Sequence, residues 1–441
     1  MSTGTDSVVR PGEPRTAIGR LTADAALGLR IGALRAGGLA LALRGDRVAR
    51  LLHRPWRLDP YPVYAQLRAA QLAGGPVRSG TGLTALATHA SVEAVLRDRR
   101  FGVRLSDGGD RLGGGEDSLL EPVDLSLLTL DAPEHTRLRR LAQPAFAPRR
   151  LAHYREVAER VTAQLLDTAL ARRGPFDLVT ELASPLPITV IAALLDVPDV
   201  DSERFARWGR ALGSALDGVK SPAHARELAR ATADLRALFA QLLEQRRLDP
   251  GEDVVSTLAT AVDGGTATAD EVLALAQLLL VAGFETTTNL IGNAVQALQR
   301  TPGEWAALVA DPGLAGAAVE ETLRFDPPVQ LTARFAHSDV EIEGRAVRRD
   351  SGVLLLLASA NRDPAVHTDP DRFDLHRVQA APHLAFSGGA HYCLGAPLAR
   401  LEGEVALRVL AERAPGMRLA GAPTPRVATV LRGPLALPVR V

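Results

Sequence analysis

Hydrophobic residues recur every three or four positions through most of the chain, which is the spacing of a helix that buries one face. The runs from Leu151 to Leu165 and from Leu228 to Leu242 show this spacing clearly. Alternation with a period of two, which is typical of strands, is confined to short stretches near Val340 to Ile342 and Val353 to Leu357. The pattern predicts a mainly α protein with a smaller β region (α+β).

The longest apolar stretch begins at Thr268, which forms a T-x-x-E capping box with Glu271 at the start of a helix. Apolar residues run almost unbroken from Val272 to Gly283, and the pattern continues to about Leu298, before Pro302. A helix of about 30 residues is about 45 Å long, well above the usual length. Because it is apolar on nearly all sides, we expect it to cross the interior of the protein.

The chain after this helix is more varied. Ala317 to Phe325 reads as a helix that ends at Asp326-Pro327-Pro328. From Asn361 to Gly389 the sequence is an irregular meander rich in Pro, Asp and His. Such a segment is too long for an idle connection, so we expect it to wrap around another part of the molecule.

The N-terminal segment looks superficially like a membrane span. The stretch from Leu21 to Leu43 carries Asp24, Arg30 and Arg35, and each charge would cost about 2.5–3.5 kcal/mol at the centre of a bilayer. We therefore predict an extension over residues 1–50 with a surface amphipathic helix, followed by one domain over residues 51–441. Met1 to Arg20 is polar and does not resemble a signal peptide. Contact with a membrane surface is the less favoured alternative.

Composition narrows the functional classes. The 441 residues include 51 basic and 51 acidic side chains, so no charge excess points to nucleic acid. The single cysteine excludes an intramolecular disulfide and fits a reducing cytoplasm. It also excludes an internal iron–sulfur cluster, which would need about four cysteine ligands.

The single cysteine, Cys393, lies where a helix is expected to begin, since Pro397 suits a first helical turn. The amides and the dipole at a helix N-terminus favour a thiolate. Nearby glycines allow the backbone to turn tightly and to approach a flat macrocycle. Taken alone, a single cysteine is more often a small buried hydrophobic residue, so the residues around it have to decide.

Those residues resemble the haem loop of the cytochromes P450, Phe-Gly-x-Gly-x-His-x-Cys-x-Gly, which is matched at Phe386, Gly389, His391, Cys393 and Gly395. Ser387 stands where the pattern has glycine, which raises a question about the loop geometry. The chain thus resembles a bacterial cytochrome P450 from about Asp59 to its C-terminus. This resemblance implies the cytochrome P450 fold, with haem b (iron protoporphyrin IX) held between the central helix and the helix of the cysteine loop. Cys393 would be the iron ligand.

Two further motifs agree with this resemblance in order and spacing. Glu321 and Arg324 match the family's E-x-x-R signature and share one helix face. Pro370-Asp371-Arg372-Phe373 resembles the meander motif, whose arginine is expected to complete the buried network. The three charged residues Glu321, Arg324 and Arg372 would brace the haem loop, and breaking such a network costs several kcal/mol.

The central helix contains Ala282-Gly283-Phe284-Glu285-Thr286, which resembles the family's oxygen motif A-G-x-[DE]-T. The Thr286 hydroxyl can donate back to the carbonyl of Ala282 and bend the helix. Gly283 would leave room for dioxygen beside the backbone. Glu285 and Thr286 are the candidate catalytic residues, because a carboxylate and a hydroxyl suit proton delivery during oxygen activation.

The two propionates of haem need positively charged or polar donors. His135 and Arg139 lie at i and i+4 on one helix face and resemble the family's early propionate-binding helix. Arg334, on a predicted strand, and His391 match the other donor positions. Charge-assisted hydrogen bonds of this kind are the strong ones.

The resemblance implies a monooxygenase that hydroxylates or epoxidises an apolar small molecule with O2. No dinucleotide-binding motif follows a strand in the sequence, so a ferredoxin and an NAD(P)H-dependent ferredoxin reductase are the expected electron donors. Substrate contacts are expected from five segments: Phe101–Leu128, Val200–Pro222, Leu279–Thr286, Val329–Thr332 and the turn near Leu431.

Three alternatives stay open on the sequence. A peroxide-driven haem peroxygenase would need no electron donor, although the acid and alcohol at Glu285 and Thr286 argue against it. A non-catalytic haem or ligand carrier would bind small molecules without forming product. A cysteine hydrolase built on Cys393 and His391 fits poorly, because two residues at one loop end do not make a triad.

Overall fold

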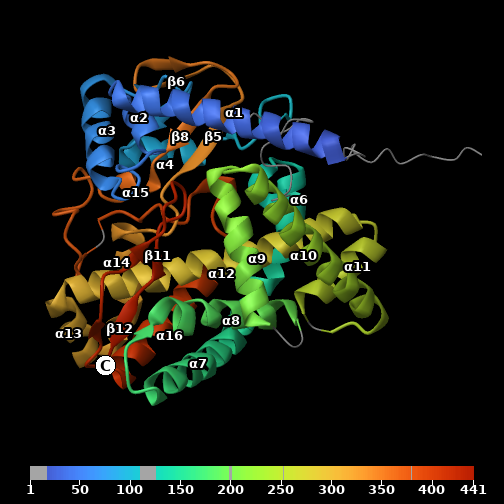
Figure 1. Cartoon of the computed structure of the whole chain (residues 1–441), viewed down its shortest axis with the longest axis vertical. Helices are drawn as coiled ribbons and strands as arrows, with labels where there is room; N and C mark the ends of the chain where they lie inside the picture. Colours follow the sequence, from blue (N-terminus) through green and yellow to red (C-terminus); the bar gives the residue numbers. More distant parts are fainter. Residues whose placement is uncertain (1–16, 110–125, 198–200, 252, 379) are drawn as a thin grey trace, which may run out of the picture.

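The computed structural model describes residues 17–109, 126–197, 201–251, 253–378 and 380–441. Helices dominate these residues (Figure 1). The α-helices are α1 Ala17–Leu43, α2 Arg47–Arg50, α3 Tyr61–Gly74, α4 His89–Arg97, α5 Ser126–Thr129, α6 Glu134–Ala142, α7 Pro148–Ala171, α8 Pro185–Leu195, α9 Ser202–Ser214, α10 Pro222–Leu248, α11 Val254–Asp263, α12 Ala269–Arg300, α13 Pro302–Ala310, α14 Ala315–Phe325, α15 Leu357–Ala360 and α16 Ala396–Arg413. The mainly α fold class predicted from the sequence is confirmed.

Within the described residues the strands are short and form four small sheets. The largest sheet has five strands in the order β1-β2-β8-β5-β3, in which only β2 and β8 run parallel. The strands are β1 Val77–Arg78, β2 Thr84–Leu86, β3 Phe101–Gly102, β4 Phe176–Asp177, β5 Thr332–Ala336, β6 Val340–Ile342, β7 Arg345–Val347, β8 Gly352–Leu355, β9 Arg418–Leu419, β10 Thr424–Pro425, β11 Pro434–Ala436 and β12 Pro438–Arg440. This sheet lies with α1 to α4 at one end of the molecule (Figure 1).

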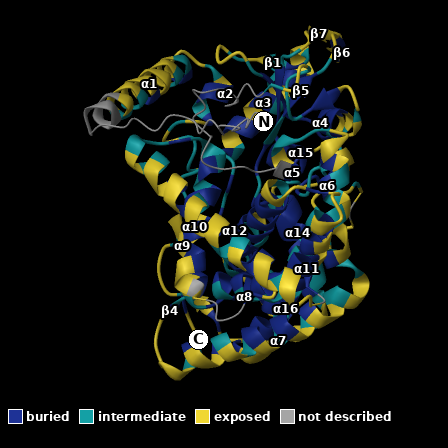
Figure 2. Cartoon of the chain, turned by 90° about the vertical axis from the view of Figure 1, so that its right-hand side faces the viewer, coloured by how far each residue is buried: buried dark blue, intermediate teal, exposed yellow. Residues whose placement is uncertain are grey.

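The predicted central helix is confirmed as α12, which has 32 residues and crosses the middle of the helical region (Figures 1 and 2). Thr268 and Glu271 form the capping box: the Thr268 hydroxyl accepts from the Glu271 amide, and the Glu271 carboxylate accepts from the Thr268 amide. The two reciprocal bonds fix the start of the helix. Pro302 then opens α13 directly after it.

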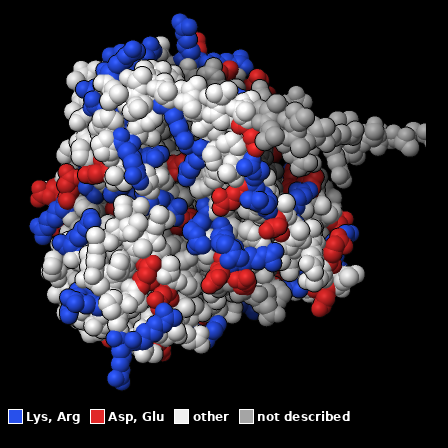
Figure 3. All heavy atoms as spheres, viewed as in Figure 1, with Lys and Arg blue, Asp and Glu red and all other residues white. Residues whose placement is uncertain are grey.

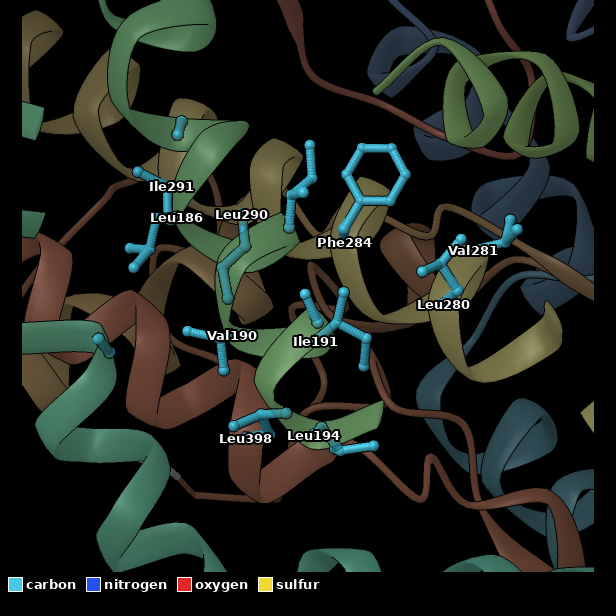
Figure 4. Packing of buried hydrophobic residues seen from close by; sticks show 14 of the residues in the cluster. Leu186, Val190, Ile191, Leu194, Leu280, Val281, Phe284, Leu290, Ile291 and Leu398 are labelled. Atoms are coloured by element: carbon cyan, nitrogen blue, oxygen red, sulfur yellow. The ribbon is translucent and has the colours of Figure 1, made fainter. Parts of the chain in front are cut away.

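Helix α8 packs along α12, with Ile191 toward Leu280 and Phe284 and Val190 toward Leu290 (Figure 4). Two glycines make this close packing possible. A Cβ on Gly283 would lie 2.9 Å from Cδ1 of Ile191, and a Cβ on Gly209 of α9 would overlap the Phe284 ring. Helices α8 and α9 therefore lie close against α12 on either side of residues 283 and 284.

The meander after α15 is irregular, as expected, and it ends in the 3-10 turn η5 Gly389–His391. Helix α16 begins five residues after it, at Ala396, with Pro397 in its first turn. Helix α16 packs on α7, α12 and α14. The end of α14, the meander and the start of α16 are thus brought to one side of α12.

Candidate functional site

Solvent-accessible surface reappears in the middle of α12, although most of this helix is buried. Ala282 is exposed and Gly283 and Thr286 are half-buried, whereas their neighbours Val281, Phe284 and Glu285 are buried. Cys393 is also exposed, and it opens the turn that leads into α16. The structure thus leaves the oxygen-motif residues and the cysteine accessible within an otherwise packed interior.

The cysteine loop keeps a tight backbone despite Ser387. Gly389 has φ +64°, and a Cβ there would lie 2.1 Å from the carbonyl oxygen of Leu96. Ser387 has φ +61°, so it adopts the left-handed conformation that glycine would adopt at no cost. The amide of Cys393 donates to the carbonyl of Phe386 at 2.9 Å and closes the loop. The loop therefore keeps its backbone conformation with serine at position 387, at the cost of backbone strain in that one residue.

The thiol of Cys393 is subject to opposing influences. Desolvation in the protein interior raises its pKa, whereas the backbone N–H groups of Gly395 and Ala396 and the positive charge of Arg139 lower it. Two amides at the start of a helix and a nearby guanidinium are the groups that stabilise a thiolate. The loop can therefore present an anionic sulfur ligand.

Four cationic or polar side chains predicted as propionate donors come together beside this loop. The rings of His135 and His391 lie 4.2 Å apart between centroids, and Nη2 of Arg139 donates to the carbonyl of Tyr392 at 2.7 Å. Arg334 is buried on β5 and donates to Thr332, to the carbonyl of Ala333 and to the Ser387 hydroxyl. Burial and the charges of His391 and Arg139 lower the pKa of His135 to about 4, so it is neutral at pH 7.

Asp131 belongs to the same cluster and was not predicted from the sequence. Its carboxylate lies 3.6 Å from Nε2 of His391 and accepts from the amides of Val103 and Arg104. Burial opposes its charge, but these donors prevail and lower the pKa of Asp131 to about 2. The only signal in the sequence was its position four residues before His135, which carries no chemistry by itself.

The E-x-x-R pair forms a buried network. Nη2 and Nε of Arg324 donate to the Glu321 carboxylate at 2.7 and 2.8 Å, and Arg324 also donates to the carbonyls of Pro370 and Arg372. The expectation for Arg372 needs correction, because its side chain is exposed and only its carbonyl takes part. The meander arginine whose guanidinium does contact the Glu321 carboxylate is Arg377, at 3.1 Å. An irregular meander has no period that would have identified Arg377.

Helix α12 supplies the acid and the alcohol. Oγ1 of Thr286 donates to the carbonyl of Ala282 at 2.7 Å, as predicted, and Thr287 makes the same bond to Gly283 at 2.9 Å. The Glu285 carboxylate is buried and pairs with Arg426, a residue that the sequence did not single out. Burial raises the pKa of Glu285, whereas the charges of Arg426 and Arg210 lower it.

Arg426 lies in a turn that connects three distant segments. The amides of Thr429 and Val430 donate to Asp217 in the 3-10 turn η3 Ala215–Asp217, which follows α9. Leu431 bridges to Val329. The partner of Glu285 is therefore fixed by the C-terminal turn, and that turn is held by the connection between α9 and α10. Of the predicted substrate segments, residues 110–125 and 198–200 lie outside the described residues.

These residues fit a haem group. The donor set consists of one sulfur that can be anionic and a cluster of cationic and imidazole side chains beside it, which suits an iron porphyrin with two propionates. Arg334 has no carboxylate within ion-pair distance among the described residues, although it is buried. Cys393 would hold the iron, and His135, Arg139, Arg334 and His391 would bind the propionates.

Comparisons with known proteins agree with this site. The family model described as cytochrome P450 matches residues 313–413. Nocardicin C N-oxygenase of Nocardia uniformis is 40% identical over 87% of this chain and 96% of its own length. The cytochrome P450 monooxygenase PikC of Streptomyces venezuelae is 38% identical over 88% of this chain and 92% of its own length.

A solved structure gives the same result for the whole fold. The chain is 42% identical to CYP164A2 of Mycobacterium smegmatis, with a TM-score of 0.79 over 90% of this chain and 99% of that one. Members of this family bind haem through a cysteine thiolate and act as monooxygenases. The fold, the cofactor and the enzyme class implied by the sequence are thereby confirmed. The chain belongs to the cytochrome P450 family.

Proposed function

We propose that this enzyme hydroxylates or epoxidises an apolar small molecule with dioxygen and two electrons from an external donor. The observation that carries the proposal is the adjacency of Glu285 and Thr286 at the accessible middle of α12. Bound haem would supply the redox chemistry, and the thiolate of Cys393 as its ligand would favour O–O cleavage. The chain's own residues supply the proton path and the walls of the site.

In this proposal Thr286 and Glu285 divide the handling of protons. The Thr286 hydroxyl uses its hydrogen on the carbonyl of Ala282, so its lone pairs remain available to accept a proton or a hydrogen bond. Glu285 lies one residue away and is buried, which raises its pKa toward the range of a useful proton donor. Arg426 holds the carboxylate in place as a positioning residue.

We infer that a ferredoxin and its NAD(P)H-dependent reductase deliver the electrons. A cavity of about 650 Å³ opens beside the cysteine loop and is lined by the loop residues Ser387 and Gly389 and by Arg97 and Arg99. Glu93 also lines it and pairs with Arg97, so Arg99 is the arginine of this opening without that partner. Arginines at an opening next to the iron ligand suit an acidic electron carrier. Because the proposed reductase needs NAD(P)H, we also propose that the enzyme works in the cytoplasm, where this reductant is available.

The substrate class stays broad. The described residues that would face it, Ala282, Val329, Leu331 and Leu431, are aliphatic, which suits an apolar body. The names of two relatives, an N-oxygenase for nocardicin C and a biotin biosynthesis cytochrome P450, indicate that similar proteins oxidise quite different small molecules.

The decisive experiment combines two variants. Cys393→Ser should abolish the red-shifted Soret band of the ferrous carbon monoxide adduct, and an unchanged band would refute the ligand assignment. Thr286→Ala should bind haem normally but consume NAD(P)H with little product. If hydrogen peroxide alone supports full turnover without electron donors, the peroxygenase alternative holds instead. Substrate binding without any product would favour a carrier.

A further inference from the structure

Helix α1 exposes an apolar face that nothing in the described chain covers. The sequence predicted a surface amphipathic helix here. In the structure Leu29, Leu39 and Leu43 are 76, 41 and 70% exposed. These three leucines share one side of the helix, which we call the α1 face and which contains no charged residue: Ala25, Ala26, Leu29, Ala33, Ala36, Leu39, Ala40 and Leu43. The exposed Arg30 and Arg35 lie on the flanks of this side. Figure 3 shows this ridge mostly free of charged side chains.

The opposite side of α1 is anchored to the body of the enzyme. Ile31 and Ala42 are buried, and Leu27 packs against the main core. Asp24 pairs with Arg226 of α10, and Nη2 of Arg35 donates to the carbonyl of Lys220 at 2.9 Å. Because the helix is held on one side, its other side is presented outward in a fixed orientation (Figure 2).

The apolar surface is concentrated in this region. Of the twelve exposed large hydrophobic residues among the described ones, five lie between residues 29 and 52. The segment Ala23–Leu43 is long and apolar enough to cross a membrane, and only 11% of its most apolar window is buried. The other segment with these properties, Ala269–Arg300, is 83% buried as the central helix α12. Exposed patches of this kind mark interaction sites.

Basic side chains adjoin one end of the α1 face. Arg44, Arg47 and Arg54 are exposed and have no carboxylate partner among the described residues. The one acidic residue between them, Asp46, accepts from the amides of Ala49 and Gly80 and from the Ser79 hydroxyl instead. An apolar face with arginines at its end matches acyl chains and anionic headgroups.

We propose that the α1 face docks peripherally on an anionic lipid surface, with Leu29, Leu39 and Leu43 in the acyl boundary and Arg44, Arg47 and Arg54 on the phosphates. The mid-helix charges Asp24 and Arg35 are used in contacts to the enzyme, so the helix lies in the interface and does not span the bilayer. This proposal is independent of the substrate and of the proton path.

The test is cosedimentation of the full-length, haem-loaded enzyme with two kinds of vesicle, phosphatidylcholine alone and phosphatidylcholine mixed with phosphatidylglycerol. We expect binding to the mixed vesicles that weakens with salt. Leu29→Ser/Leu39→Ser/Leu43→Ser should lower the partition constant by about tenfold or more. Arg44→Gln/Arg47→Gln/Arg54→Gln should remove most of the preference for the anionic vesicles.

A matched control is Leu72→Ser/Leu248→Ser/Val378→Ser, which changes three exposed hydrophobic residues outside the α1 face and should bind as the parent does. The carbon monoxide spectrum and the melting temperature of each variant report whether it folds. The proposal is overturned if the parent binds neither vesicle, or if the control loses binding as strongly as the α1 variant. It is also overturned if the parent forms a dimer that the α1 variant disrupts and if vesicles do not compete with the formation of that dimer.

Discussion

Two buried carboxylates lie on opposite sides of the haem site and are held in very different ways. Glu321, on the side of the cysteine loop, accepts from Arg324, Arg377 and the amide of Asp374. Glu285, on the oxygen side, has a single donor among the described residues, Arg426, whose Nε is itself buried without a partner. A fully satisfied network is rigid, whereas a sparsely held charge can change its state. The difference suits a fixed ligand loop and a working proton donor.

The largest loss of stability is expected when the hydrogen-bond network around Glu321 is broken. Arg324→Ala leaves Glu321 buried with fewer donors and removes a donor from the carbonyls of Asn361, Pro370 and Arg372, so we expect a loss of about 3–5 kcal/mol and little haem-loaded protein. Carbon monoxide difference spectra and thermal unfolding measure both. Arg372→Ala is the control and should change stability by less than about 0.5 kcal/mol, because that side chain is exposed. If Arg372→Ala costs as much stability as Arg324→Ala, the Arg372 side chain takes part in the network after all.

On the oxygen side, Arg426→Gln should preserve folding and haem binding but lower the product formed per NAD(P)H by about threefold to tenfold, less than the loss of a proton-transfer group itself. Because the charge of Arg426 lowers the pKa of Glu285, its removal raises that pKa and protonates more Glu285 at neutral pH. A carbonyl stretch in the infrared difference spectrum, absent in Glu285→Gln, would report this protonation.

Arg426→Lys keeps the charge and serves as the matched variant. It should recover most of the coupling and lose the infrared band. If the lysine variant does not recover the product formed per NAD(P)H, Arg426 does not act through its charge. It then acts through the conformation of the turn whose amides donate to Asp217.

Glu320 offers a third carboxylate that is well paired but only partly buried. Burial opposes its charge, and the hydrogen bonds from His383 and Arg400 lower its pKa to about 2. A lowered pKa adds stability above the ordinary pKa of glutamate, and this stability is lost as the pH falls through about 2. Glu320→Gln should therefore cost about 1 kcal/mol or less at pH 7, and the gap in melting temperature should narrow toward acid. If the difference in melting temperature stays constant with pH, Glu320 contributes through packing rather than through its charge.

The smallest effect is expected at Ser387 in the cysteine loop. Ser387→Gly removes a left-handed serine but also its 3.3 Å bond from Arg334, so the net gain should be about 1 kcal/mol or less. Ser387→Ala keeps the strain and loses the hydroxyl, and it should be less stable than the parent. Urea unfolding of the three proteins gives the order. If the glycine variant is less stable than the parent, the Ser387 hydroxyl contributes more to stability than relief of the backbone strain does.

Local patterns predicted the fold correctly and also indicated many of the candidate site residues. The capping box and apolar run of α12 and the residues around Cys393 are contained within short stretches, so the sequence reveals them directly. Arg426 could not be predicted, because 141 residues separate it from Glu285 and the turn that carries it has no periodic pattern. Arg377 was missed for a similar reason, since an irregular meander does not show which arginine points inward. For α1, hydropathy indicated a surface helix, but only packing shows which side faces outward.

The position of the last strands has a consequence for how the enzyme is made. β12 pairs with β4 and β9, and the turn before β11 carries Arg426 and the bridge from Leu431 to Val329. A nascent chain that has emerged only to the end of α16 contains the whole cysteine loop but lacks this wall. The part of the site that Arg426 and Leu431 form can therefore fold only after the residues up to β12 have been synthesised.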